Sequence, residues 1–217
     1  MLNQRTDEEL LQHISCVVFD VETTGLGGDA RIVEIAAVRL EAWQPVAELQ
    51  TLIQPEVRIS SSASQVHQIT EDMVVNAPTF DEVAPALAHL MQDAVLVGHN
   101  IFSFDLRFIK KQLRAVFGSG PNNWAVDTLP LARKLMDGTS HTLEGLSATL
   151  GIPLIAHHAM SDVYATAELW MHLVRVLMRR GGIQLFDVSR FNALKQLDGS
   201  GLPRFNEAPD FTAMPRP

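Results

Sequence analysis

Hydrophobic and polar positions alternate over the first third of the chain in a way that is typical of β-strands. A short apolar, β-branched run covers residues 16–20 and ends in turn-forming residues at 24–29. The alternation resumes over residues 32–40 and, less clearly, over residues 46–53. Because only short connections separate these segments, we expect a three-strand antiparallel meander.

After residue 70 the apolar positions recur at helical spacing. We expect a strand over 94–98 and helices over 72–75, 80–91, 105–117, 128–136, 142–150 and 161–180. Gly181 and Gly182 end the last of these helices. The pattern predicts an α/β domain over residues 1–182, with a further helix over 186–197 and a proline-containing tail making up residues 183–217.

Composition narrows the class of protein. With 217 residues, 47% of them hydrophobic and 19% charged, the chain can bury a full core without disulfides. Its apolar runs are far shorter than the roughly 20 residues that span a bilayer, its N-terminus has no apolar signal core, and its single Cys16 lies in an apolar run. We therefore expect a globular cytoplasmic protein with no membrane partner.

The charge of the chain is unevenly distributed. A net charge of −8 argues against binding nucleic acid through a general basic coat. The excess of acid lies before residue 175, whereas the remainder of the chain is net basic. Clustered carboxylates repel one another unless cations neutralise them, so the acidic body favours metal-binding Asp and Glu residues.

Carboxylates follow several apolar elements. Asp20 and Glu22 alternate with Val21 at the end of the first strand, so their side chains share one face. Asp105 opens a helix beyond the strand at 94–98, and Asp162 lies in the first turn of the long helix. Alone, each has an ordinary explanation as a solvent-facing strand end or a helix cap. Together with a nearby histidine they favour Mg²⁺ or Mn²⁺, rather than Zn²⁺, and a titrating base.

In these residues the sequence resembles the DEDDh 3′-5′ exonucleases, the DnaQ-like or proofreading exonucleases of the ribonuclease H-like superfamily. The matching motifs, which extend over about residues 15–178, are Phe19–Leu26, Ile32–Ala36, Val66–Thr70, His99–Asp105 and His157–Asp162. Asn100 and Asp105 lie five positions apart, one more than is common in the family, which predicts a bulge between them. The tyrosine-using subclass is excluded because the single tyrosine, Tyr164, follows Asp162.

The resemblance implies a ribonuclease H-like mixed sheet, a meander plus parallel strands, flanked by helices. It implies that two Mg²⁺ or Mn²⁺ ions are held by Asp20, Glu22, Asp105 and Asp162, and that His157, rather than His158, is the general base. It also implies a pocket for the 3′-terminal nucleotide, lined by Thr23, Thr24, Leu26, Val66, His67 and Phe104. For these six residues a purely structural role remains open, since Leu26 and Phe104 suit a core and His67 suits a local turn.

The function expected from the resemblance is a metal-dependent exonuclease that hydrolyses the 3′ end of single-stranded or frayed DNA to nucleoside 5′-monophosphates, in replication or repair. One alternative is a 3′ exonuclease acting on RNA or oligoribonucleotides. Another is an interaction subunit that binds a DNA polymerase or a sliding clamp. Helical spacing also aligns Arg107, Lys110, Lys111 and Arg114 in a basic stripe, which either follows the substrate strand or is a solvated face.

Overall fold

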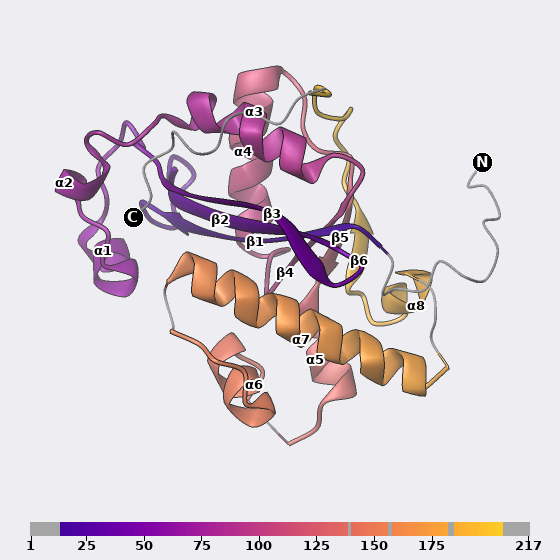
Figure 1. Cartoon of the computed structure of the whole chain (residues 1–217). Coiled ribbons are helices and arrows are strands. Elements are labelled where there is room, and N and C mark those ends of the chain that lie inside the picture. The colour runs from indigo at the N-terminus through magenta and orange to yellow at the C-terminus, as the bar shows by residue number, and fades with distance from the viewer. Residues whose placement is uncertain (1–13, 139, 156–157, 182–184, 206–217) are drawn as a thin grey trace.

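The computed structural model describes residues 14–138, 140–155, 158–181 and 185–205. Its centre is a six-stranded mixed sheet in the order β3-β2-β1-β4-β5-β6 (Figure 1). The strands are β1 (Cys16–Thr23), β2 (Ile32–Glu41), β3 (Gln44–Leu52), β4 (Val95–Gly98), β5 (Trp124–Asp127) and β6 (Leu194–Gln196). The first three form the antiparallel meander, β4 and β5 continue the sheet in parallel with β1, and β6 closes it antiparallel to β5.

Helices cover both faces of the sheet (Figure 1). They are α1 (Ser61–His67), α2 (Glu71–Val74), α3 (Phe80–Met91), α4 (Asp105–Phe117), α5 (Thr128–Leu135), α6 (Leu143–Leu150), α7 (Ala159–Arg179) and α8 (Leu185–Ser189). One apolar core lies between the sheet and α3 and α4, and a second lies between the sheet and α5, α6 and α7. Alternate residues of β1 feed the two cores, since Phe19 packs in the first and Val18 in the second.

The mixed α/β architecture predicted from the sequence is confirmed, including the meander and the strand before α4. The helix predicted over residues 186–197 is wrong, because α8 ends at Ser189 and residues 194–196 form strand β6. Pairing with β5, which is distant in sequence, decides the conformation there. The division of the chain at residue 182 stays a prediction, and most of the predicted tail, 206–217, lies outside the described residues.

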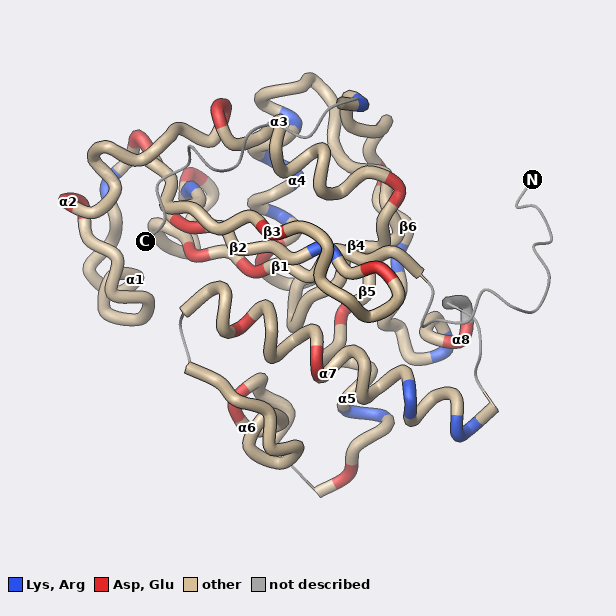
Figure 2. Tube along the Cα trace, viewed as in Figure 1, with Lys and Arg blue, Asp and Glu red and all other residues tan. Residues whose placement is uncertain are grey.

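Charge is distributed along α7 in the way the sequence suggests. Its first half carries Asp162 and Glu168, and its last turns carry Arg175 and Arg179, a change visible in Figure 2. The first turn of α7 places Asp162 beside Asp20 and Glu22 at the end of β1. Within the described part of the chain, no helix combines the length and apolar character needed to cross a membrane.

Candidate active site

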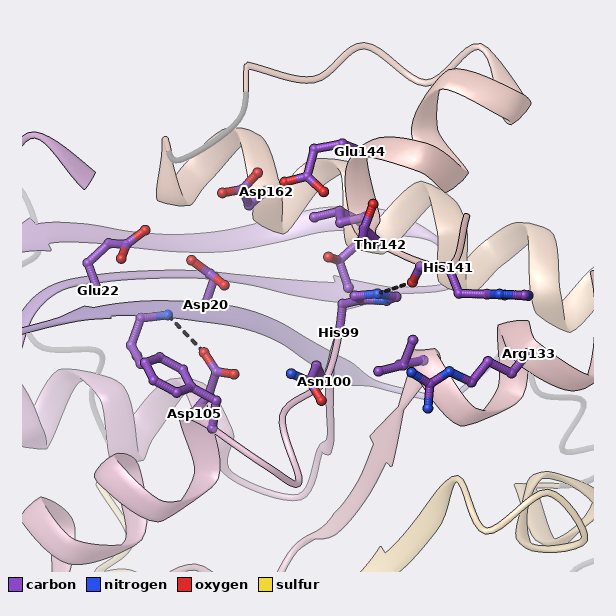
Figure 3. A pocket seen from close by; sticks show the side chains of 15 residues that line it. Asp20, Glu22, His99, Asn100, Asp105, Arg133, His141, Thr142, Glu144 and Asp162 are labelled. Atoms are coloured by element: carbon purple, nitrogen blue, oxygen red, sulfur yellow. Dashed lines mark hydrogen bonds between the residues drawn. The ribbon is translucent and has the colours of Figure 1, made fainter. Parts of the chain in front are cut away.

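The end of strand β1 presents two carboxylates to helix α7. Val21 is buried in the core beneath α3 and α4, so its neighbours Asp20 and Glu22 project from the opposite face of the sheet. Asp162, in the first turn of α7, reaches the same place, and one ligand oxygen from each of the three carboxylates lies within 4.8 Å of the others. Figure 3 shows these three side chains converging. The grouping predicted from strand alternation is thus present.

Asp105 joins the group from the other layer of the fold. It opens α4, is only 3% exposed, and accepts a hydrogen bond of 3.2 Å from the backbone N–H of Val21. The preceding segment makes a wide turn in which the N–H of Leu106 donates to the carbonyl of Ile101, five residues back, and Asn100 has a φ of 65°. This geometry fits the bulge predicted between Asn100 and Asp105.

Burial, with some added repulsion between neighbouring acids, makes the carboxylates of Asp20, Glu22 and Asp105 unusually basic. Burial, followed by the charges of Asp105 and Glu22, raises the pKa of Asp20 well above its usual value. Burial and then the neighbouring Glu34 raise the pKa of Glu22 to about 8. Burial raises the pKa of Asp105 to about 7, although the hydrogen bond from Val21 opposes the shift. In the absence of cations the cluster therefore favours protonated carboxyls.

Glu34 is a further acid that sequence reasoning did not assign to the site. It lies directly opposite Glu22 in the β1–β2 register, is 6% exposed, and accepts a hydrogen bond from Gln50 Nε2 at 3.1 Å. Burial raises its pKa, and the bond from Gln50 opposes the shift. Like charges directly opposite one another destabilise a sheet. A buried acid here adds to the need for compensating positive charge in the site.

Asp127 is a second residue that sequence reasoning missed. Its carboxylate, at the end of β5, accepts hydrogen bonds from the backbone N–H groups of Asn100 (2.8 Å), Phe102 (3.1 Å) and Leu129 (3.0 Å). The last of these caps α5, and the first two fix the loop that leads to Asp105. An Asp immediately before a predicted helix was the available signal for the cap. The contacts to the loop could not be read from the sequence.

His99 connects the same loop to the segment before α6. Its Nε2 donates to the carbonyl of His141 at 3.0 Å, and its Nδ1 lies 2.8 Å from Thr128 Oγ1. Burial lowers the pKa of His99, so the ring is suited to this neutral, structural arrangement. His99 therefore holds two walls of the site together.

Of the two histidines considered as the base, His157 lies outside the described residues. His158 occupies the N-cap position of α7, makes no side-chain capping hydrogen bond there, and is exposed. After burial, which raises the pKa of Glu34, and the bond from Gln50, which lowers it, His158 also lowers that pKa. The assignment of His157 as general base stays a prediction.

Phe104 alone of the six residues predicted to bind the terminal nucleotide lines the cleft that contains the carboxylates. Thr23 ends β1, Thr24 follows it, and both are buried. His67 Nε2 donates to the carbonyl of Thr23 at 3.2 Å. The adjacent Leu26 and Val66 are exposed, at 76% and 51%. These six positions stay predicted contacts of the nucleotide.

Three of the four side chains in the basic stripe of α4 bond to the protein. Arg107 donates to the carbonyl of Leu26 at 2.8 Å, and its guanidinium lies over the ring of Phe108, 4.5 Å from the centroid. Lys111 donates to the carbonyl of Gly28, and Lys110 pairs with Asp198. The stripe therefore anchors the glycine-rich β1–β2 loop, in addition to any contact with substrate.

The carboxylates open into a cleft of about 520 Å³, within the range of about 300–1,000 Å³ that is usual for ligand sites. Its lining combines the site residues with parts of α5 and the segment entering α6. In Figure 3 the carboxylates occupy one end, Arg133 and His141 the other, and His99 and Asn100 lie between them. The arrangement can hold cations at one end and an extended ligand along its length.

Comparisons with known proteins place the chain in a family. The exonuclease family model RNase_T matches residues 17–170, and the chain belongs to this exonuclease family. The expected resemblance to 3′-5′ exonucleases is thereby confirmed at the level of the family.

Individual relatives and solved structures agree with this family assignment. DNA polymerase III PolC-type of Thermotoga maritima is 31% identical over 192 residues, which cover 88% of this chain but only 14% of that protein. The structure of exonuclease X in complex with 5′ overhanging duplex DNA matches with a TM-score of 0.60 and 30% identity, covering 80% of this chain and 99% of that one. E. coli exonuclease I in complex with a dT13 oligonucleotide shares the fold, with a TM-score of 0.68 and 21% identity over 77% of this chain and 42% of that one.

Proposed function

We propose that this protein is a divalent-metal-dependent 3′-5′ exonuclease that hydrolyses the terminal phosphodiester of single-stranded or frayed DNA and releases nucleoside 5′-monophosphates. The observation that carries the proposal is the convergence of Asp20, Glu22 and Asp162 within 4.8 Å, beside buried Asp105, in a member of an exonuclease family. Carboxylates at this separation serve as a shared ligand set for cations rather than as isolated surface charges.

The donor set fits two Mg²⁺ or Mn²⁺ ions. It consists of carboxylate oxygens, which these hard cations prefer, and it is too crowded and too buried to stay ionised without compensating charge. When bound, two such ions activate a water and stabilise the charge on the leaving 3′-oxygen. Asp20, Glu22, Asp105 and Asp162 are the residues that would hold them.

The remaining roles fall to residues around the carboxylates. His157 takes the proton of the attacking water, for which an imidazole of ordinary pKa near 6.5 is suited at neutral pH. Phe104, half-buried at the wall of the cleft, offers an aromatic surface to a base, a contact that does not depend on base identity. Asp127 and His99 keep the walls of the cleft at a fixed separation through the hydrogen bonds described above.

The proteins to which this chain is similar support DNA, rather than RNA, as the substrate. Exonucleases X and I are described in complex with DNA, and the Thermotoga relative is a DNA polymerase. Because this chain spans only 14% of that polymerase, association with a polymerase or a sliding clamp is a separate proposal. Action on RNA ends remains the second candidate, and the cytoplasmic location stays a prediction.

The test is incubation of the purified chain with a 5′-labelled single-stranded DNA and an RNA of the same sequence, in Mg²⁺ or in EDTA. We expect the DNA to shorten from its 3′ end in single-nucleotide steps, with 5′-monophosphates as products and no reaction in EDTA. Glu22→Gln removes the activity, whereas Glu168→Gln, a change at an exposed position of α7, keeps it. Shortening from the 5′ end would overturn the proposed direction, and activity in EDTA would overturn the dependence on a divalent metal. Faster loss of the RNA would overturn the preference for DNA.

A further inference from the structure

The cleft contains one cation that the proposed chemistry leaves without a role. Arg133 of α5 lines the cleft at the end remote from the carboxylates (Figure 3). It is exposed, and among the residues that the structure describes it forms no ion pair or hydrogen bond. An unpaired guanidinium facing a cleft is suited to an anionic ligand group.

The position of Arg133 relative to the carboxylates is fixed by the fold. Leu129 and Arg133 are four residues apart, so they share the face of α5 that lines the cleft, while Leu131, Ala132 and Leu135 are buried behind them. The carboxylate of Asp127 both caps α5 and holds the loop leading to Asp105. One side chain thus ties the helix bearing Arg133 to the turn bearing a predicted metal ligand.

The chemistry of the proposed substrate determines which anionic group can lie beside Arg133. A strand that is cut at its 3′-terminal phosphodiester has no phosphate beyond the scissile one on the 3′ side. Any second phosphate in the same cleft must therefore belong to the nucleotide on the 5′ side. The rest of the lining offers it no second guanidinium or ammonium group, since Asn100 and Thr142 are amide and hydroxyl side chains, His141 Nε2 donates to the carbonyl of Met136, and Glu144 is acidic.

We propose that Arg133 binds the phosphate adjacent to the scissile phosphate on its 5′ side, and so sets a minimum substrate length. This inference rests on the proposed exonuclease function. A helix-dipole role is the competing explanation, because Arg133 and Lys134 both lie in the last turn of α5. Lys134 is exposed and does not line the cleft, which makes it a matched control. Figure 2 shows this basic segment at the end of α5.

The experiment compares two substrates that differ in the second phosphate. The p-nitrophenyl ester of thymidine 5′-monophosphate has a single phosphodiester, whereas the trinucleotide TpTpT has a second phosphate 5′ to its terminal bond. With Arg133→Ala we expect kcat/KM for TpTpT to fall by about 10- to 100-fold, the range for a lost charge-assisted hydrogen bond. The ester should be hydrolysed at the wild-type rate, and Lys134→Ala should change neither. On longer single strands, a plot of the logarithm of the binding constant against the logarithm of the salt concentration should become shallower. Its slope should decrease in magnitude by about 0.7 for the one lost phosphate contact.

Each other result has a distinct meaning. Equal losses on both substrates would overturn the subsite, because Arg133 would then act at the scissile group or on the fold. Unchanged hydrolysis of TpTpT would overturn it as well, leaving a solvated side chain. Matching effects of Arg133→Ala and Lys134→Ala on melting temperature, with no substrate dependence, would support the dipole explanation instead. If the wild-type protein hydrolyses neither substrate, it is the proposed function that fails.

Discussion

Removing one carboxylate from the cluster should stabilise the protein when no divalent cation is present. Glu22 has an ordinary pKa of 4.5 and a pKa of about 8 in the folded protein, chiefly because of burial and the neighbouring Glu34. The folded state therefore binds a proton that the unfolded state releases at neutral pH. The contribution of Glu22 to stability is therefore full below pH 4.5 and is lost as the pH rises from there through about 8. Glu22→Gln cannot ionise and escapes this loss.

The size of the gain follows from the shift. At about 1.4 kcal/mol for each pKa unit, and with some relief by solvent, the ionisable Glu22 destabilises the fold by about 2–4 kcal/mol at pH 7.5 and by less than about 1 kcal/mol at pH 5. For a chain of this size, 1 kcal/mol moves the melting temperature by about 2–4 °C. Glu22→Gln should therefore melt about 5–15 °C above the wild type at pH 7.5 in EDTA. At pH 5 the two melting temperatures should nearly coincide.

The assay is thermal unfolding followed by circular dichroism in EDTA at both pH values. Glu168→Gln removes the same charge from an exposed site on α7 and should shift the melting temperature by no more than about 2 °C. In millimolar Mg²⁺ the order should reverse, because the wild type gains more stability from the ions than the variant does. If Glu22→Gln melts at or below the wild type in EDTA at pH 7.5, ionised Glu22 does not destabilise the fold as its burial and its acidic neighbours require.

Three further changes probe the surroundings of the site. Asp127→Ala removes the acceptor of three backbone hydrogen bonds, and it should lower the free energy of unfolding by about 2–4 kcal/mol in urea titrations and reduce kcat. Arg107→Ala removes the hydrogen bond that holds the carbonyl of Leu26, a predicted contact of the terminal nucleotide. KM for single-stranded DNA should therefore rise by about 2- to 10-fold at nearly constant kcat in steady-state assays. His157→Ala should lower the single-turnover rate by about 10²- to 10⁴-fold while His158→Ala stays near wild type, and a reversed order would move the base to His158.

The parts of the fold that were predictable are those encoded by local periodicity. Strand alternation places Asp20 and Glu22 on one face, and the helical spacing of α4 separates its buried Leu106, Ile109 and Leu113 from its basic stripe. Both follow from neighbours in the sequence. The α/β class also followed from the alternation of strand and helix patterns, whereas the mixed order of the sheet was expected from the family resemblance.

What escaped prediction depends on contacts between distant segments. Glu34 faces Glu22 only because of the register of β1 and β2, which the sequence does not state. Asp127 ends a four-residue strand too short to show alternation, and its bonds to the loop at 100–102 cross from one strand end to another. The segment 194–196 takes its conformation from β5, although its own residues suit a helix. Tertiary pairing overrides local preference at each of these places.

The central claim is that the carboxylate cluster forms the hydrolytic centre of an exonuclease. It is tested most directly by measuring, in Mg²⁺, the shortening of a 5′-labelled oligonucleotide by wild-type protein and by Asp162→Asn side by side, with the melting temperature of each recorded in EDTA. We expect the wild type to shorten the strand from its 3′ end, and the variant to lose more than 100-fold in kcat while melting at or above the wild-type temperature. A folded variant that keeps more than about a tenth of the wild-type kcat would contradict the account.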